Sequence, residues 1–133
     1  MNKTKFTTEY EINASTKHLF PYLNTGSGLA EWFADKVQVD QDKLYSFVWD
    51  GKIHKARKVA QKTNQYVKFE FININTEERR SQNYIEFHLD SNELTQTSFL
   101  KIVDYTDDSE DTLQELWDNL VTTLKEKVGA LPK

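Results

Sequence analysis

The segment TLQELWDNLVTTLKEKVG, residues 112–129, constrains the fold more than any other part of the chain. Its apolar residues recur at spacings of three and four, which is the period of one face of an α-helix. Acidic residues crowd its start, and Lys125 and Lys127 precede Gly129 at its end, so both ends suit the helix dipole. The pattern predicts one long amphipathic helix, whose apolar stripe needs another apolar surface to cover. The stripe consists of Leu113, Leu116, Trp117, Leu120, Val121, Leu124 and Val128.

Short strands are predicted to supply that surface. Residues Lys5 to Ile12 alternate between apolar and polar side chains, which is typical of a half-buried strand. Similar stretches follow, separated by turn residues such as Asp50–Gly51 and Thr63–Asn64, and neighbours joined so closely are expected to pair antiparallel. These further strands are expected at residues 36–40, 43–49, 52–62, 65–72, 83–90 and 95–105.

Two short helices are expected between the first strand and the others. Ser15 can cap a helix over Thr16–Leu23, in which Pro21 must lie early or break the helix. A second helix is expected over Gly28–Phe33. The chain is therefore predicted to be one α+β domain over residues 1–133, with a curved antiparallel sheet of about seven strands that grips the last helix.

Alternation along the strands predicts which side chains face the last helix. The strand at residues 52–62 fits alternation poorly, because Ile53 and Val59 share a parity with Lys55 and Arg57, so a bulge or a frayed edge is expected there. Ala56 would leave room beneath larger neighbours. The inward positions are expected to be Val37, Val39, Tyr45, Phe47, Trp49, Val67, Phe69, Phe71, Ile85, Phe87, Leu89, Leu100 and Ile102, with Leu116, Trp117 and Leu120 above them.

The stretch TGSG at residues 25–28 resembles a phosphate-binding loop only superficially. It lacks the third glycine of a dinucleotide fingerprint and the Gly-Lys-Ser/Thr of a P-loop. We instead expect Gly26 and Gly28 to free the backbone for a sharp turn, with Ser27 as a cap and with Trp32 and Phe33 as anchors. A gate at the mouth of a pocket is the alternative use of this segment.

The sequence contains only weak signals for a metal site or a catalytic site. Glu86, His88 and Asp90 would stand roughly 7 Å apart in succession on one strand face, which suits a solvated surface better than one metal ion. His18 and His54 are isolated, and residues 104–115 imitate a calcium loop but carry Ser109 where glycine is required. The chain has no cysteine and no Gly-x-Ser-x-Gly elbow. We expect no metal, no cofactor and no catalytic residue that the sequence can single out.

Charge and hydropathy limit the classes of partner that the sequence predicts. The net charge is −4, and the clusters KIHKARK at residues 52–58 and EERR at 77–80 are read as solvated surface, so nucleic acid is not expected. No stretch approaches the roughly 18 apolar residues of a membrane helix. A cytoplasmic location is the resulting expectation.

The order of elements resembles the START-related helix-grip superfamily, which includes polyketide cyclases, the birch-pollen allergen group and heat-shock ATPase activators. The stretch GLAEWFADKVQVD, residues 28–40, looks like the Trp-Phe segment of the activator branch, and LKIVDYTDD leads into the last helix as in that family. The resemblance implies a cavity between the sheet and the last helix, which takes apolar or amphipathic molecules in many relatives. Some relatives instead bind proteins.

The leading functional hypothesis is a module that binds an apolar or amphipathic small molecule. Its predicted binding residues are Trp32, Phe33, Phe47, Trp49, Phe69, Phe71, Phe87, Leu116, Trp117 and Leu120. A protein-interaction module like the ATPase activators is one alternative, and a cyclase-like enzyme with an ionisable side chain in the pocket is another. A solid core whose sheet edge makes a homodimer is the fourth, so the chain is expected to be a monomer or a homodimer.

Overall fold

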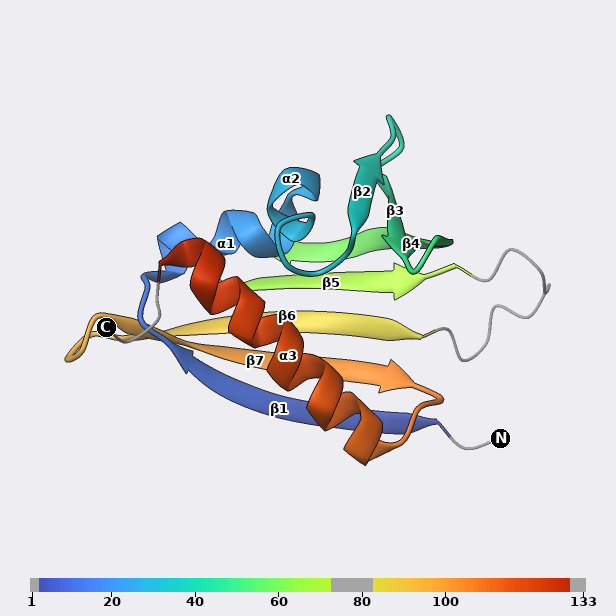
Figure 1. Ribbon diagram of the computed structural model, residues 1–133. Coiled ribbons are helices and arrows are strands. Elements are labelled where there is room, and N and C mark those ends of the chain that lie inside the picture. Colours follow the sequence, from blue (N-terminus) through green and yellow to red (C-terminus); the bar gives the residue numbers. More distant parts are fainter. Residues whose placement is uncertain (1–2, 73–82, 130–133) are drawn as a thin grey trace.

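The structure is a computed structural model that describes residues 3–72 and 83–129. Seven strands form one antiparallel sheet in the order β1-β7-β6-β5-β4-β3-β2, and α3 lies across one face of it (Figure 1). The predicted α+β helix-grip fold is thus confirmed. The elements are β1 (Thr4–Ile12), α1 (Thr16–Asn24), α2 (Gly26–Leu29), β2 (Lys36–Val39), β3 (Leu44–Trp49), β4 (Lys52–Lys62), β5 (Tyr66–Phe71), β6 (Tyr84–Asn92), β7 (Thr97–Thr106) and α3 (Glu110–Val128).

Helix α3 has the ends that its sequence predicts. Ser109 is the N-cap, and its hydroxyl accepts a hydrogen bond from the backbone N–H of Thr112. Gly129 ends the helix at φ 74°, a left-handed conformation that glycine adopts without a steric penalty. The buried stripe is narrower than expected, because Leu116 is 44% exposed while Trp117 is 1% exposed. Leu116 is therefore not an inward residue.

The sheet confirms most of the inward positions and corrects one of them. The predicted irregularity in β4 is present as a register shift between Lys58 and Ala60 in the pairing with β5. The mixed pattern before this shift has a different cause, because Ile53 lies on the same outward side as Arg57 and is 65% exposed, whereas Ala56 is buried. Val39 is 43% exposed because it lies in the short edge strand β2, where no further strand covers it.

The short helices differ in detail from their prediction. Pro21 lies inside α1 without breaking it, and α1 continues to Asn24. Helix α2 spans Gly26–Leu29 rather than Gly28–Phe33, and its cap is Thr25, whose Oγ1 accepts from the Gly28 N–H at 2.9 Å. Turns carry the chain on from α2 to Phe33. Within the described residues, no helix is both long and apolar enough to cross a bilayer.

Candidate functional site

The space between the sheet and α3 is filled by aromatic rings. Phe33 stacks on Trp117 with the ring centroids 5.8 Å apart, and it meets the edge of Phe47 at 5.1 Å and of Phe87 at 5.9 Å. All of these side chains are buried. Offset and edge-to-face contacts of this kind add to the stabilisation from burial alone. We call this group, which also includes Trp32, the aromatic cluster; it occupies the place that the family resemblance assigns to a cavity.

One carboxylate is buried beside this cluster. Asp104, on β7, is 7% exposed, and its Oδ2 accepts a hydrogen bond of 2.9 Å from the Trp117 indole N–H. Burial, which disfavours the charged form, raises the pKa of Asp104 to about 6, and the charge of Asp108 acts in the same direction. The Trp117 hydrogen bond opposes the shift because it stabilises the carboxylate. Asp104 is the buried acid that alternation did not reveal, because it occupies an inward position in a strand where an apolar residue would be expected.

Asp104 should make the protein more stable in mild acid. Its folded pKa lies above the unfolded value of 3.8, so its contribution to stability is complete below about pH 4 and is lost as the pH rises through about 6. The difference between the two pKa values is worth about 3 kcal/mol. Relative to the native chain, Asp104→Asn is expected to gain about 2–3 kcal/mol of unfolding free energy between pH 4 and pH 8, measured by urea denaturation. The exposed Asp90→Asn is the control; a constant difference between the Asp104 variant and the native chain would contradict the assignment.

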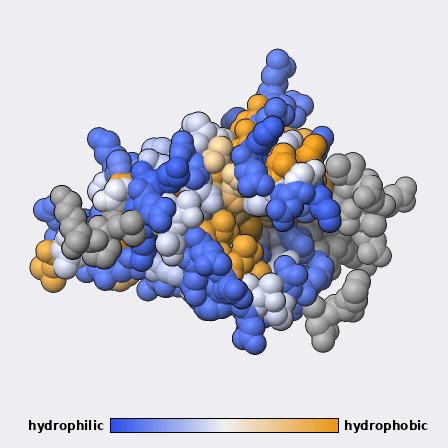
Figure 2. All heavy atoms as spheres, in the orientation of Figure 1, coloured by the Kyte–Doolittle hydropathy of each residue, from blue (hydrophilic) through white to orange (hydrophobic). Residues whose placement is uncertain are grey.

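An open pocket lies at the rim of the sheet, between the segment after α2 and helix α3. Its volume is about 320 Å³, at the lower end of the range for small-molecule sites. Figure 2 shows hydrophobic atoms exposed in a hollow in this region, with hydrophilic residues around them. We call it the rim pocket; its lining consists of Ala30, Glu31, Trp32, Phe33, Ala34, Asp35, Trp49, Leu120 and Thr123.

The predicted binding residues separate into three groups. Trp32, Phe33, Trp49 and Leu120 meet in the lining of the rim pocket. Leu116 is exposed on α3, and Phe71 is partly buried against the core. The remaining four are buried in the core: Phe47, Phe69, Phe87 and Trp117.

Sequence reasoning missed the polar half of the rim pocket. Glu31 and Asp35 flank the Trp-Phe pair, and Thr123 lies one turn after Leu120 on α3. Their proximity to Trp32 and Leu120 was the available signal. Carboxylates beside an apolar surface can bind the cationic or hydrogen-bond-donating end of a molecule, and they can accept a proton from it.

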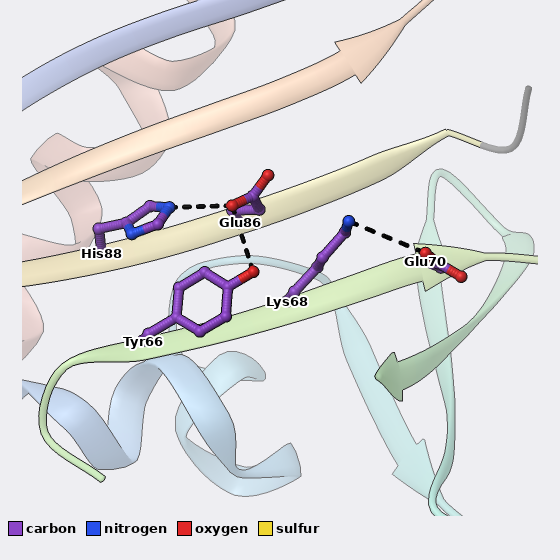
Figure 3. A network of polar contacts seen from close by, with 5 residues as sticks. All are labelled: Tyr66, Lys68, Glu70, Glu86 and His88. Atoms are coloured by element: carbon purple, nitrogen blue, oxygen red, sulfur yellow. Dashed lines mark hydrogen bonds and ion pairs between the residues drawn. The ribbon is translucent and has the colours of Figure 1, made fainter. Parts of the chain in front are cut away.

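The opposite face of the sheet carries a polar network. Glu86 accepts a hydrogen bond from the Tyr66 hydroxyl at 3.2 Å, and its Oε1 lies 3.0 Å from His88 Nε2 (Figure 3). Burial and the neighbouring Glu86 carboxylate raise the pKa of Tyr66 to about 12. Glu86 and His88 alternate with buried Ile85 and Phe87, as predicted. In the described part of the chain, no three His, Asp or Glu residues are grouped so that they could hold a metal ion. The EERR cluster lies outside the described residues.

Solved structures share this fold. BfR322 from Bacteroides fragilis is 34% identical, with 100% of this chain and 96% of that chain covered and a TM-score of 0.63. The Aha1 dimer from Colwellia psychrerythraea is 17% identical over 94% of this chain and 96% of that chain, with a TM-score of 0.77. CalU16 from Micromonospora echinospora is 12% identical over 99% and 86%, with a TM-score of 0.67. The last two likenesses show the fold alone.

A comparison with curated proteins finds no match. The family model described as a START-like superfamily domain matches residues 1–130, nearly the whole chain. Together with the gripped helix α3 and the order of the strands, this match identifies the chain as a member of the START-like superfamily.

Proposed function

We propose that the chain binds a small amphipathic molecule in the rim pocket. The observation that carries the proposal is the pocket itself, an open volume of about 320 Å³ whose lining brings Trp49 and Leu120 together with Glu31 and Asp35. Ligand sites usually combine apolar walls with a few polar groups, and in this pocket the accessible lining is at least as polar as it is apolar. The rim pocket opens at the surface, whereas the family resemblance implies a cavity between the sheet and the last helix.

Binding should be visible in the intrinsic fluorescence. The chain has three tryptophans, of which Trp32 and Trp49 line the rim pocket. Octanol, a neutral probe that is short enough to avoid micelles, is expected to change the emission saturably and to raise the melting temperature. A ligand at a hundredfold its dissociation constant adds about 2.7 kcal/mol to the stability.

A matched pair of variants on α3 tests the location. Thr122 and Thr123 each donate a side-chain hydrogen bond to the backbone carbonyl four residues earlier, but only Thr123 lines the pocket. Thr123→Phe should fill the pocket and weaken octanol binding by about tenfold or more, equivalent to about 1.4 kcal/mol. Thr122→Phe should leave it unchanged. Absence of saturable binding, or equal binding by the two variants, would refute the proposal.

The second candidate is a protein-interaction module. The observation in its favour is that the rim pocket is open and that Leu116, one turn from Leu120, is exposed on the same helix. A partner side chain could then insert where the small molecule is proposed to bind. A stoichiometric complex with a purified partner that Thr123→Phe abolishes and Thr122→Phe preserves would favour this candidate.

A further inference from the structure

The charged residues that line the rim pocket are acidic. Its lining includes Glu31 and Asp35 and, among the described residues, no lysine, arginine or histidine. Lys52 pairs with Trp49 in the sheet, and the His54 ring lies 5.1 Å from the Trp49 ring, but neither belongs to the lining. The ionisable residues of the lining are therefore acidic, and the nearest ion-pair partner is Lys127, outside the lining, 3.7 Å from Glu31.

The hydrogen-bond donors of the lining are already in use. Trp32 Nε1 donates to the Tyr22 carbonyl at 2.8 Å, and Trp49 Nε1 donates to the Phe33 carbonyl at 2.6 Å. The Thr123 hydroxyl donates to the Asn119 carbonyl at 3.4 Å. The lining side chains thus present mainly acceptors to a ligand, and a carboxylate or phosphate head group would find repulsion without compensating donors.

The two carboxylates are available to a cation. Asp35 Oδ2 accepts from the Asp50 N–H at 3.1 Å, which orients the carboxylate without neutralising it. Glu31 lies 3.7 Å from Lys127, and both side chains are about half exposed. An exposed ion pair of this kind is weak, so a ligand amine can replace the Lys127 ammonium. Indole rings add attraction for a cation, and the net charge of −4 favours its approach.

We infer that the rim pocket selects amphipathic molecules whose polar end is a protonated amine and discriminates against those that end in a carboxylate. The inference rests on the proposed function, because it assigns the head group of the molecule that the rim pocket binds. The apolar tail would lie against Trp49 and Leu120, and the ammonium would lie toward Glu31 and Asp35.

A series with one tail and three head groups tests the inference. Octylamine, octanol and octanoate are titrated at pH 7.5 in low salt, and the tryptophan emission is followed. Octylamine is expected to bind about tenfold or more tightly than octanoate, with octanol between them, and 0.5 M NaCl should reduce the difference. The double variant Glu31→Gln/Asp35→Asn should lose most of the preference for octylamine over octanoate.

A charge-matched control distinguishes the effect of the charges in the rim pocket from the effect of the net charge of the protein. Glu110→Gln/Asp111→Asn removes two exposed acids at the other end of α3 and should keep the preference of the native chain. Equal affinities for the three probes, or a preference that survives in the Glu31/Asp35 variant, would overturn the inference while octanol binding still supports the proposed function. Failure of all three probes to bind would overturn both.

Discussion

Trp117→Ala is expected to lower the free energy of unfolding by about 3–5 kcal/mol. The indole is 1% exposed and packs against Phe33 and Phe87, so its removal leaves a void that the surrounding sheet cannot close. It also deprives the buried Asp104 of its hydrogen-bond donor. Urea denaturation followed by circular dichroism measures the loss without depending on tryptophan emission.

Two further variants separate packing from hydrogen bonding. Leu116→Ala removes a large apolar side chain from the adjacent, exposed position and should cost less than about 1 kcal/mol. Trp117→Phe keeps most of the packing but cannot donate to Asp104, so its cost should be greater at pH 8, where Asp104 is charged, than at pH 5. If Trp117→Ala cost no more than Leu116→Ala, the aromatic cluster would not be the packed core described above.

Gly28→Ala is expected to destabilise the chain by about 3 kcal/mol or more. A Cβ at this position would overlap the Pro21 carbonyl oxygen and lie 2.6 Å from the Tyr22 Cα. Both obstacles are backbone atoms of α1, so the two helices would have to separate. Thermal unfolding measures the cost.

Gly26→Ala provides the matched control. Its Cβ would lie 2.8 Å from Val39 Cγ2, the end of a partly exposed side chain that can rotate away. A cost below about 1 kcal/mol is expected. Similar losses at the two glycines would contradict the view that close approach of α1 and α2 is what requires glycine at residue 28.

Periodicity along the sequence was sufficient to predict the fold. The spacing of Leu113, Trp117, Val121 and Leu124 determines which face of α3 is buried, and alternation places Ile85, Phe87 and Leu89 inside the sheet. It could not predict how wide the buried stripe is, because that depends on the curvature of the sheet beneath it. Leu116 therefore satisfied the pattern and is nevertheless exposed.

The site was less predictable than the fold, for a physical reason. A pattern of apolar residues identifies side chains that leave water, but not whether a ligand or another side chain replaces the water. The predicted binding residues Phe47, Phe87 and Trp117 are buried, and all three rings contact Phe33. From the sequence, Glu31 and Asp35 would normally be assigned to a solvated surface. Their place in a pocket becomes evident only in the fold, which brings Trp49 and Leu120 next to them.

The aromatic cluster also has a consequence for protein engineering. An apolar void lined by large side chains stays dry and accepts an apolar guest of matching shape. Shortening residue 117 to alanine would leave a space among the rings that surround the indole, with the Asp104 carboxylate at its edge. In the native chain the Trp117 indole, which is part of α3, fills this space. The Trp117→Ala variant would therefore be a designed binding site for a free molecule of similar shape.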